Sequence, residues 1–344
     1  FIPELPGLED VGYLTSDTLW ETFAERDQIP KRLVMLGGGP IGCELAHAFA
    51  RLGSDVTLIE RGTRIMAKED EEVSDLVAKA MSRDGVTLLT EHEAIRCEWA
   101  DEAKTQKVIV VKHKDKESVI EFDDLICAVG RQARLEGFGL EALGIETKRT
   151  VVTNEYLETL YPNIFAAGDV AGPFQFTHTA SHQAWYAAVN ALFGRFWRFK
   201  ADYSVIPWAT FTDPEVARVG ISEQDAKKEG IEYQVTRYGI DDLDRAIADS
   251  GAEGFIKVLT VPGKDKILGA IIVSEHASEL LPEFVFAMKH GLGLNKILGT
   301  IHVYPTWSEA NKYTAGEWKR ANQPEKLLAW VEKFHTWQRG GKSS

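Results

Sequence analysis

Cysteine is scarce in this 344-residue sequence, and the three that occur are widely separated. Cys43, Cys97 and Cys127 form neither a CxxC nor a CxxxxC pair. Because a local redox disulfide or a structural zinc site needs closely spaced thiols, the sequence indicates neither. We expect the three cysteines to be small residues of the core.

Long apolar runs and an excess of basic residues are also missing. No stretch of about 18 apolar residues occurs, and the sequence opens at Phe1 without a basic and apolar leader. Lys and Arg number 39 against 52 Asp and Glu, which gives a formal net charge of -13. Because phosphate-rich partners need concentrated positive charge, we expect neither nucleic acid nor a membrane as a partner. The sequence favours a cytoplasmic protein that acts on a small molecule.

Hydrophobic periodicity divides the sequence into regions, and its length predicts two or three domains. Residues 1–30 are interpreted as a linker or domain edge. Residues 31–134 alternate apolar strands with helices in the rhythm of a parallel sheet, with a β-meander at 95–122. Residues 204–330 place strands before a helical run, which predicts an α+β domain. The expected strands are Lys31–Leu36, Asp55–Glu60, Val86–Leu89, Leu125–Val129, Ile164–Gly168, Phe255–Thr260 and Ile267–Val273. The expected helices are Thr18–Arg26, Pro40–Leu52, Glu69–Arg83, Thr177–Phe193 and Glu279–His290.

A glycine-rich turn lies directly after the first of these strands. Residues 37–42, of which Gly37, Gly39 and Gly42 are the motif glycines and Pro40 follows them into the helix, fit GxGxxG. Glycine permits the tight turn and lets backbone N–H groups approach a diphosphate at the positive end of a helix. The plainer alternative is that these glycines only permit the helix to pack on the strand.

Glu60 ends the next strand, about 20 residues after the glycines, as dinucleotide sites require. A carboxylate there accepts a hydrogen bond from the adenosine ribose 2′-OH and repels a 2′-phosphate, which favours NADH over NADPH. Arg61 and Arg64 lie nearby and weaken that preference. In the plainer alternative, Glu60 is a solvated turn residue.

Further motifs follow in a fixed order. Gly37–Glu44 fits GxGxxGxE, Leu125–Arg131 ends an apolar strand with Gly-Arg, and Thr159–Asp169 reads TLYPNIFAAGD. These segments resemble the nucleotide motif, the strand before GRxPN and the second flavin motif of pyridine nucleotide-disulfide oxidoreductases, the family of dihydrolipoamide dehydrogenase and mercuric reductase. Residues 132–134 depart from the Pro-Asn ending of GRxPN. Segments at 207–220, 245–247 and 253–257 resemble the dimerisation domain of that family.

The resemblance implies an α/β fold in several parts. It implies a Rossmann-like NAD-binding domain at 31–134, the C-terminal part of an FAD-binding domain at 135–203, an α+β dimerisation domain at 204–330 and a tail at 331–344. It therefore also implies FAD and NAD as cofactors and a homodimer.

The same resemblance assigns roles to single residues. Glu44 would lie near the nicotinamide, and Gly130 would end the strand of the Gly-Arg motif. Asp169 would hydrogen bond a ribityl hydroxyl of FAD. Thr177 and His178 would start a helix facing the flavin pyrimidine end, where a helix N-terminus stabilises negative charge on reduced flavin.

The N-terminal flavin half of this family, with its own GxGxxG and a CxxxxC redox pair, does not occur before Lys31. We therefore expect a truncated or naturally shorter protein. A flavin held only by the later motif lacks its diphosphate anchor, so we expect FAD binding by this fragment to be weak or absent.

The segment His302–Glu309 resembles HxHPTxxE of dihydrolipoamide dehydrogenase, in which the second His is the acid–base catalyst and the Glu orients it. Tyr304 replaces that His here. It would position a substrate or donate a proton, and the plainer alternative is an aromatic residue that packs beside Pro305. A phenol with an ordinary pKa of about 10 is a poor base near neutral pH, so lipoamide is disfavoured as the substrate. A tyrosine at this position resembles the mercuric reductase branch of the family. However, the C-terminal cysteine pair of that branch is missing from 333–344.

These observations predict a flavoprotein oxidoreductase that transfers hydride from NADH to FAD and then electrons to a disulfide, thiol-reactive or metal acceptor. Tyr304 and Glu309 would line the acceptor site of the partner subunit. One alternative is a flavin transhydrogenase or NADH oxidase without a cysteine pair. Another is a non-catalytic module that binds a nucleotide and dimerises.

Two more patterns have plainer interpretations beside the functional ones. His178 and His182 have the i, i+4 spacing that can bind zinc, but no third ligand follows from the sequence, so no metal site is predicted. Trp318, Trp330, Phe334 and Trp337 are expected on one amphipathic helix, for which packing across a dimer is simpler than membrane binding.

Overall fold

The computed structural model describes residues 1–340 and divides into two compact units, Phe1–Asp213 and a second that begins at Pro214. Each unit is described by itself below. Among the residues described, no helix combines the length and hydrophobicity that a membrane crossing requires.

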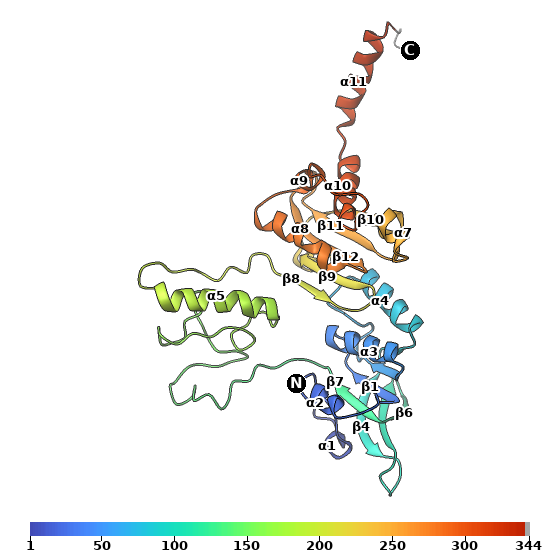
Figure 1. Ribbon diagram of the computed structural model, residues 1–344, viewed down its shortest axis with the longest axis vertical. Coiled ribbons are helices and arrows are strands. Elements are labelled where there is room, and N and C mark those ends of the chain that lie inside the picture. The colour runs from blue at the N-terminus through green and yellow to red at the C-terminus, as the bar shows by residue number, and fades with distance from the viewer. Residues whose placement is uncertain (341–344) are drawn as a thin grey trace. The chain divides into compact units, whose positions relative to one another are not determined.

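A four-stranded parallel sheet in the order β3-β2-β1-β7 organises the first unit. Its strands β1 and β7 are labelled in Figure 1. β1 pairs with β2 through Leu33↔Val56 and with β7 through Val34↔Leu125. Buried strands of a parallel sheet are apolar on both faces, which explains their continuous Val, Leu and Ile runs. The predicted Rossmann-like architecture is confirmed. Its elements are β1 (Arg32–Leu36), α3 (Pro40–Leu52), β2 (Asp55–Ile59), α4 (Glu71–Arg83), β3 (Thr87–Leu89) and β7 (Asp124–Cys127).

An antiparallel three-stranded sheet, β4-β5-β6, is inserted between β3 and β7 and confirms the predicted meander. Its strands are β4 (Glu93–Trp99), β5 (Lys107–His113) and β6 (Lys116–Phe122). Two short helices precede β1, namely α1 (Leu8–Val11) and α2 (Leu19–Ala24). Ile109 of the meander, Leu8 of α1 and Val34 of the parallel sheet belong to one buried cluster. The meander is therefore part of the same core as the parallel sheet.

The segment between β7 and β8 (Pro207–Thr210) contains a single long helix, α5 (Thr177–Phe193), with the predicted bounds. The predicted strand Ile164–Gly168 is wrong. Phe165 forms only an isolated bridge with Glu158, because no neighbouring strand among the described residues extends the ladder. Ile145, Val151 and Ala166 form a small buried cluster beneath this segment.

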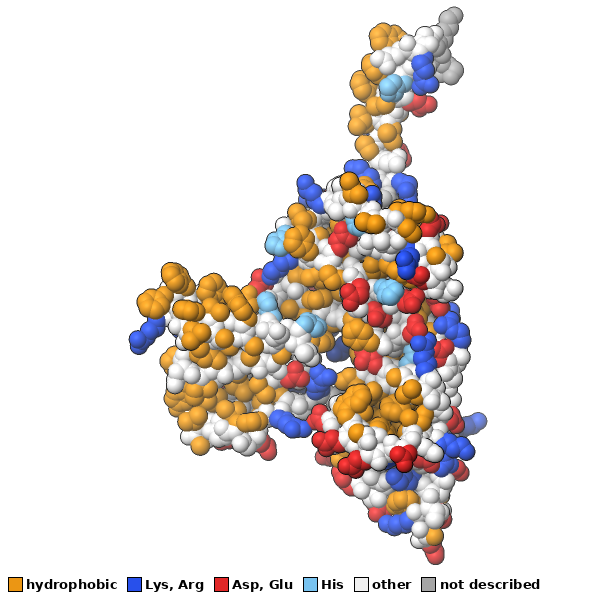
Figure 2. Space-filling view, in the orientation of Figure 1, with side chains coloured by type: hydrophobic (Ala, Val, Ile, Leu, Met, Phe, Trp, Pro, Cys, Tyr) orange, Lys and Arg blue, Asp and Glu red, His pale blue; other side chains and the backbone are white. Residues whose placement is uncertain are grey.

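Large hydrophobic side chains are exposed over the α5 segment (Figure 2). Leu192 is 73% exposed, Phe196 76% and Trp197 71%. Soluble monomers rarely expose contiguous apolar surface of this kind, so the α5 segment lacks the cover that a closed domain provides.

The second unit contains antiparallel strands that are adjacent in the order β10-β11-β12-β9, with α8 against β12 and β9 and α10 against β10. The predicted α+β class of this region is confirmed. Its strands are β9 (Glu215–Gly220), β10 (Gln234–Gly239), β11 (Phe255–Thr260) and β12 (Ile267–Ser274). Its helices are α6 (Glu223–Glu229), the 3-10 turn η1 (Ile240–Asp242), α7 (Asp244–Ala248), α8 (Ala277–Lys289), α9 (Leu294–Leu298), α10 (Glu309–Ala321) and α11 (Glu325–Gln338).

The aromatic residues near the C-terminus do not share one helix, contrary to prediction. Trp318 lies in α10 and is 5% exposed, whereas Trp330, Phe334 and Trp337 lie in α11, which has no buried residue. Pro324 separates the two helices because it has no N–H to donate to the preceding turn. The predicted tail at 331–344 begins within α11, and its last residues, 341–344, lie outside the described residues.

Candidate functional site

Two glycines of the turn between β1 and α3 are required by packing. Gly37 has a φ of +109°, and a Cβ there would lie 2.6 Å from the carbonyl oxygen of Ala128 after β7. A Cβ on Gly42 would collide with the carbonyl oxygen of Gly37. The helix, the turn and the strand therefore approach so closely at these two positions that only glycine fits, whether or not a ligand binds.

Gly39 is different, because a Cβ built at this position would meet no atom within 4 Å. Gly39 is the N-cap of α3 and Pro40 its first residue, and no side chain caps this end of the helix. First-turn amides without a side-chain acceptor, together with the helix dipole, attract an anion. Packing does not explain glycine here, whereas a diphosphate in contact with the backbone does, so these residues fit a dinucleotide.

The carboxylate of Glu60 lies between two loops of this site. Its Oε2 accepts a hydrogen bond from the amide of Gly38 at 2.7 Å, and its Oε1 accepts one from the amide of Gly62 at 2.6 Å. Each carboxylate oxygen can accept a second hydrogen bond, so the group remains able to receive a ribose hydroxyl. Glu60 is therefore a fixed acceptor beside the glycine turn rather than a solvated turn residue.

Arg64 lies near Glu60 in the sequence, where its positive charge would weaken the preference for NADH. In the structure its guanidinium has other hydrogen-bond partners. Its guanidinium donates to the carbonyl oxygen of Glu69 at 2.7 Å, to Ser74 Oγ at 2.6 Å and to the carbonyl oxygen of Ala67 at 3.1 Å. These bonds hold Arg64 against the start of α4. A guanidinium with these partners is poorly placed to receive a 2′-phosphate, whereas Arg61 is exposed.

Glu44 lies one turn into α3 and is half-buried. Its Oε1 accepts a hydrogen bond from the amide of Phe211 at 2.8 Å. Burial raises the pKa of Glu44, and the hydrogen bond from Phe211 and the charge of Arg131 only partly oppose that effect. The position gives a carboxylate that is fixed in orientation and less acidic than usual.

The Gly-Arg and Gly-Asp motifs, predicted separately, come together in the structure. Gly130 has a φ of +153°, and Arg131 after it lies 3.5 Å from Asp169 Oδ2 and donates to the carbonyl oxygen of Gln175 at 2.9 Å. The Asp169 side chain is 40% exposed, so its carboxylate remains accessible. Such a carboxylate can accept a hydrogen bond from a ribityl hydroxyl.

Gln183, which sequence reasoning missed, holds the Gly-Asp loop on α5. Its Oε1 accepts from the amide of Gly168 at 2.6 Å, and its Nε2 donates to the carbonyl oxygen of Gly172 at 2.6 Å and to the hydroxyl of Tyr203 at 2.8 Å. The side chain is fully buried. In the sequence, Gln183 is marked only as a polar residue among the Ala residues of an expected helix. That pattern does not indicate which backbone groups it would bind.

The N-terminus of α5 is exposed at Thr177 and His178 and has no side-chain cap. His178 Nε2 lies 2.8 Å from the carbonyl oxygen of Pro207, and His182 Nε2 lies 3.1 Å from that of Asp202. Because a carbonyl only accepts, both Nε2 atoms carry hydrogen. The pair has no third ligand, because the described residues contain no group of three or more His, Cys, Asp or Glu arranged for a metal.

Tyr304 and Glu309 lie in the second unit. The Tyr304 side chain is 65% exposed, its peptide bond to Pro305 is cis, and its hydroxyl donates to Asp244 Oδ2 at 2.9 Å. This hydrogen bond and the charge of Asp244 raise the pKa of Tyr304. Within this chain the phenol is exposed rather than packed, and no sequence pattern singles out Asp244.

Glu309 is 7% exposed and has other partners than Tyr304. Its Oε2 accepts from the amide of Thr306 at 3.1 Å, and its Oε1 accepts from the hydroxyl of Tyr313 at 3.0 Å. Glu309 therefore fixes the loop that carries Tyr304, while Asp244 orients the phenol itself.

All three cysteines are buried and free, as predicted for core residues. Burial raises the pKa of each of the Cys43, Cys97 and Cys127 thiols to about 12. None is therefore a thiolate near neutral pH, and these residues supply no redox nucleophile.

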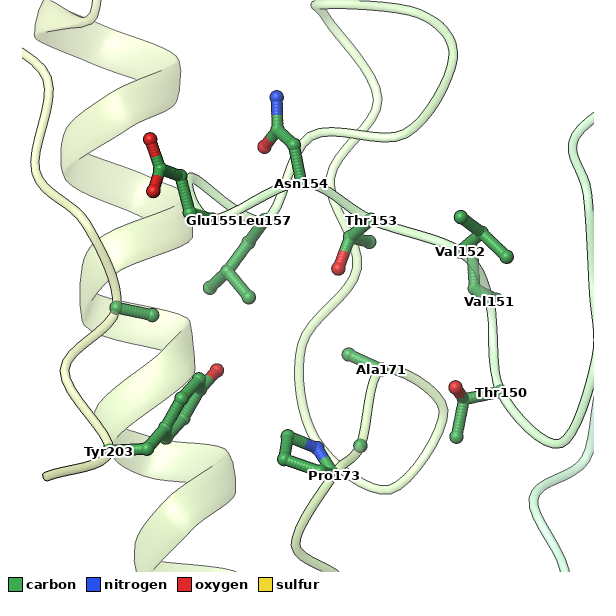
Figure 3. Close-up of a pocket in the computed structure, with 12 residues that line it drawn as sticks. Thr150, Val151, Val152, Thr153, Asn154, Glu155, Leu157, Ala171, Pro173 and Tyr203 are labelled. Atoms are coloured by element: carbon green, nitrogen blue, oxygen red, sulfur yellow. The ribbon is translucent and has the colours of Figure 1, made fainter. Parts of the chain in front are cut away.

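A pocket of about 370 Å³ opens in the α5 segment (Figure 3). Asn154, Pro173 and Tyr203 are among its lining residues. Its acidic residue, Glu155, pairs with Lys200 at 2.8 Å. The lining thus offers no unpaired charge, and the pocket does not include the motif residues.

Two family models match the chain, and both carry the description of one family. The model described as pyridine nucleotide-disulphide oxidoreductase matches residues 1–184, and the model of the dimerisation domain of that family matches residues 206–315.

Individual relatives agree with these matches. Mercuric reductase from Bacillus cereus is 34% identical over 312 residues, which are 90% of this chain and 48% of that protein. Dihydrolipoyl dehydrogenase from Chlamydia pneumoniae is 35% identical over 287 residues, 83% of this chain and 60% of that protein. The chain thus spans about half or somewhat more of the length of the curated relatives it matches.

Among solved structures, the HOCl-induced flavoprotein disulfide reductase RclA from Escherichia coli has a TM-score of 0.81 at 26% identity, covering 92% of this chain and 71% of that one. The glycine turn, the fixed carboxylate of Glu60 and the Asp169 loop therefore stand in a shared architecture. The chain belongs to the class I pyridine nucleotide-disulphide oxidoreductase family.

Proposed function

We propose that this chain binds NADH through Gly39, the first turn of α3 and Glu60. The observation that carries this proposal is the carboxylate of Glu60, held by the amides of Gly38 and Gly62 next to an uncapped helix N-terminus. The helix end would bind the diphosphate, and Glu60 would accept the ribose 2′-OH.

In a protein that combines this chain with a complete FAD-binding domain, we propose oxidoreduction from NADH to a disulfide, thiol-reactive or metal acceptor. FAD, when bound, supplies the two-electron relay between nicotinamide and acceptor. Glu44 would shape the nicotinamide site, and its raised pKa limits negative charge there. Asp169 would accept a ribityl hydroxyl, and the amides of Thr177 and His178 would face the flavin ring.

Tyr304 would line the acceptor site of the partner subunit. Its phenol stays protonated to higher pH than an ordinary tyrosine because of Asp244, so it would bind or donate a proton rather than act as a base. Glu309 would keep the loop of Tyr304 in place. The match to the dimerisation domain supports a homodimer.

FAD binding by this chain alone is proposed to be weak. Asp169 and the start of α5 provide contacts to only part of such a cofactor. Leu192, Phe196 and Trp197, at and beyond the other end of α5, are exposed, and so apolar a surface fits a domain that needs further polypeptide to cover it.

One observation favours a second candidate for the chain by itself. Its three thiols are buried with a pKa of about 12 each, so they cannot relay electrons near neutral pH. As an isolated chain it would then be a nucleotide-binding and dimerising module without turnover. A transhydrogenase or NADH oxidase remains the alternative for a protein whose flavin half has no cysteine pair.

The test is fluorescence titration of the chain with NADH and NADPH, comparing Glu60→Gln with Glu71→Gln, an exposed control at the start of α4. A hydrogen bond to a charged group contributes about 1.5–3 kcal/mol, so E60Q should weaken NADH binding by roughly 10- to 100-fold. E71Q should bind normally. Failure of the chain to bind either dinucleotide, or equal binding by E60Q, would overturn the proposal.

The acceptor is tested separately by NADH oxidation with disulfides or Hg(II), using the chain joined to an FAD-binding half of the same family. Turnover that depends on Tyr304 supports the oxidoreductase. NADH binding without turnover by any such assembly supports the non-catalytic module instead.

A further inference from the structure

Helix α11 has an apolar face that no described part of the chain covers. Leu327 is 53% exposed, Trp330 62% and Trp337 74%, and no residue of the helix is buried. Together with Phe334 these residues recur at intervals of three and four, so they form one apolar stripe along the helix. Figure 2 shows hydrophobic side chains gathered along one side of α11. The stripe lies beyond residue 315, where the match to the dimerisation domain ends.

The aromatic rings of the apolar stripe pack on one another. The ring centroids of Trp330 and Phe334 are 5.8 Å apart with the rings inclined by 13°, and those of Phe334 and Trp337 are 6.2 Å apart. A tryptophan combines an apolar body with one N–H donor, and for that reason it is enriched where a membrane meets water. The stripe therefore has the composition of a helix that lies in such an interface.

Two lysines border the apolar stripe. Lys326 lies four residues before Trp330, and Lys333 lies four residues before Trp337, so each lysine is one turn away from a tryptophan on the same side of the helix. Both lysines are exposed, and neither forms an ion pair within the described residues. A lysine at such a border can lay its methylene chain along apolar surface and keep its ammonium group in a polar layer.

The carboxylates of α11 lie on the opposite side. Glu325 and Glu332 stand two residues before Leu327 and Phe334, which is a rotation of about 200° around the helix. Negative charge therefore faces away from the apolar stripe, while positive charge borders it. The whole chain has a net charge of -13, which predicts no membrane partner, but that sum does not describe this face. The face of α11 is complementary to a surface that is apolar inside and anionic at its boundary.

A second copy of α11 fits the stripe less well. When two helices pair through apolar stripes, the residues that border each stripe face the partner helix. Antiparallel pairing would set the lysine border of one copy against that of the other, and like charges repel. Parallel pairing would set the lysines against Val331 and Gln338, which carry no charge. Neither arrangement gives Lys326 or Lys333 an acidic partner.

We propose that α11 binds the surface of an anionic lipid bilayer. The apolar stripe would enter the boundary between headgroups and acyl chains, and Lys326 and Lys333 would reach the lipid phosphates. The helix has 14 residues and a length of about 21 Å, so it would lie in the plane of the membrane rather than cross it. This binding requires neither NADH nor FAD.

Co-sedimentation of the full chain with vesicles tests the charge. The vesicles contain phosphatidylcholine and phosphatidylserine in equal parts, and vesicles of phosphatidylcholine alone should bind more weakly. One basic residue near an anionic surface contributes about fivefold in affinity, so the double variant Lys326→Gln/Lys333→Gln should lose roughly tenfold or more. Glu325→Gln/Glu332→Gln neutralises the same number of charges on the far side of the same helix and should lose no affinity.

Trp330→Gln tests the apolar stripe and should weaken binding to the mixed vesicles by roughly tenfold or more, because burial of a large apolar side chain is lost. Urea unfolding checks that all variants fold. Analytical ultracentrifugation without vesicles tests the second copy, and the mass should be the same for W330Q and the unaltered chain. A smaller assembly in W330Q would assign the stripe to self-association. That result, equal binding to both kinds of vesicle, or equal affinities of the lysine and glutamate variants would overturn the proposal.

Discussion

The hydroxyl of Tyr304 lies 2.9 Å from Oδ2 of Asp244 and donates a hydrogen bond to it. The two residues are 60 positions apart, one before a cis proline and the other at the start of α7. The pair places a protonated phenol, rather than an imidazole, at the position that the resemblance to HxHPTxxE would assign to an acid–base residue. A site of this kind suits binding or proton donation better than proton abstraction.

Asp244→Asn should lower the pKa of Tyr304. The carboxylate of Asp244 accepts a hydrogen bond from the protonated phenol, and its negative charge disfavours the phenolate. Ionisation of the phenol would then begin at lower pH than in the unaltered chain. Carbon-13 NMR of labelled tyrosines measures this, with Tyr304→Phe to assign the signal. An unchanged or higher pKa in D244N would contradict the assignment.

Gln183→Ala should loosen the loop that carries Asp169. The substitution leaves the amide of Gly168 and the carbonyl of Gly172 without their partner, and an unsatisfied buried group costs about 1–3 kcal/mol. Hydrogen exchange at Gly168 should accelerate, and the unfolding free energy should fall by that amount or more. Ser181 is exposed on the same helix, so Ser181→Ala serves as the control, and equal exchange at Gly168 in both variants would speak against the role of Gln183.

Gly39→Ala and Gly42→Ala should separate ligand binding from folding. A Cβ at Gly39 meets nothing, so G39A should fold with a loss within about 1 kcal/mol yet bind NADH more weakly because the methyl group obstructs the diphosphate. A Cβ at Gly42 meets the carbonyl oxygen of Gly37, so G42A should lose about 1–3 kcal/mol of stability. Urea unfolding and NADH titration measure the two effects. Normal NADH affinity in G39A would remove the assigned role of Gly39.

Asp123 should contribute to stability in a pH-dependent way. It accepts hydrogen bonds from the amide of Arg32 at 2.9 Å and from its guanidinium at 2.6 Å, and the guanidinium bonds hold the pKa of Asp123 below its usual value. A carboxyl group with a lowered folded pKa stabilises the fold above its unfolded pKa of about 4, and this contribution is lost as the pH falls through the folded value.

Asp123→Asn should therefore lower the unfolding free energy by about 1 kcal/mol at about pH 7, a modest value because the side chain is partly exposed. The difference from the unaltered chain should shrink as the pH falls below about 4. Urea unfolding at several pH values measures it, with Asp115→Asn in the exposed β5–β6 turn as the control. A difference that grows on acidification would contradict the sign.

Much of the fold could be predicted because its signals are local. The apolar runs of β1 and β2, the glycine turn and the bounds of α5 follow from patterns within about 20 residues. Ile164–Gly168 has a strand-like pattern, but a strand needs a neighbour, and that partner is not a property of the segment itself. Pro324 is a local signal for the break between α10 and α11, and it outweighs the aromatic spacing that predicted one continuous helix.

Local sequence patterns are sufficient to predict the proposed dinucleotide site, because glycine at a strand–helix turn and a carboxylate at the end of the next strand are adjacent in any βαβ unit. Which side chains complete the proposed sites depends on the tertiary structure. The bonds of Gln183 to Gly168 and of Asp244 to Tyr304 depend on side-chain orientation and register. A hydrogen bond forms within about 3 Å and in one direction, and composition and spacing along the chain do not specify either condition.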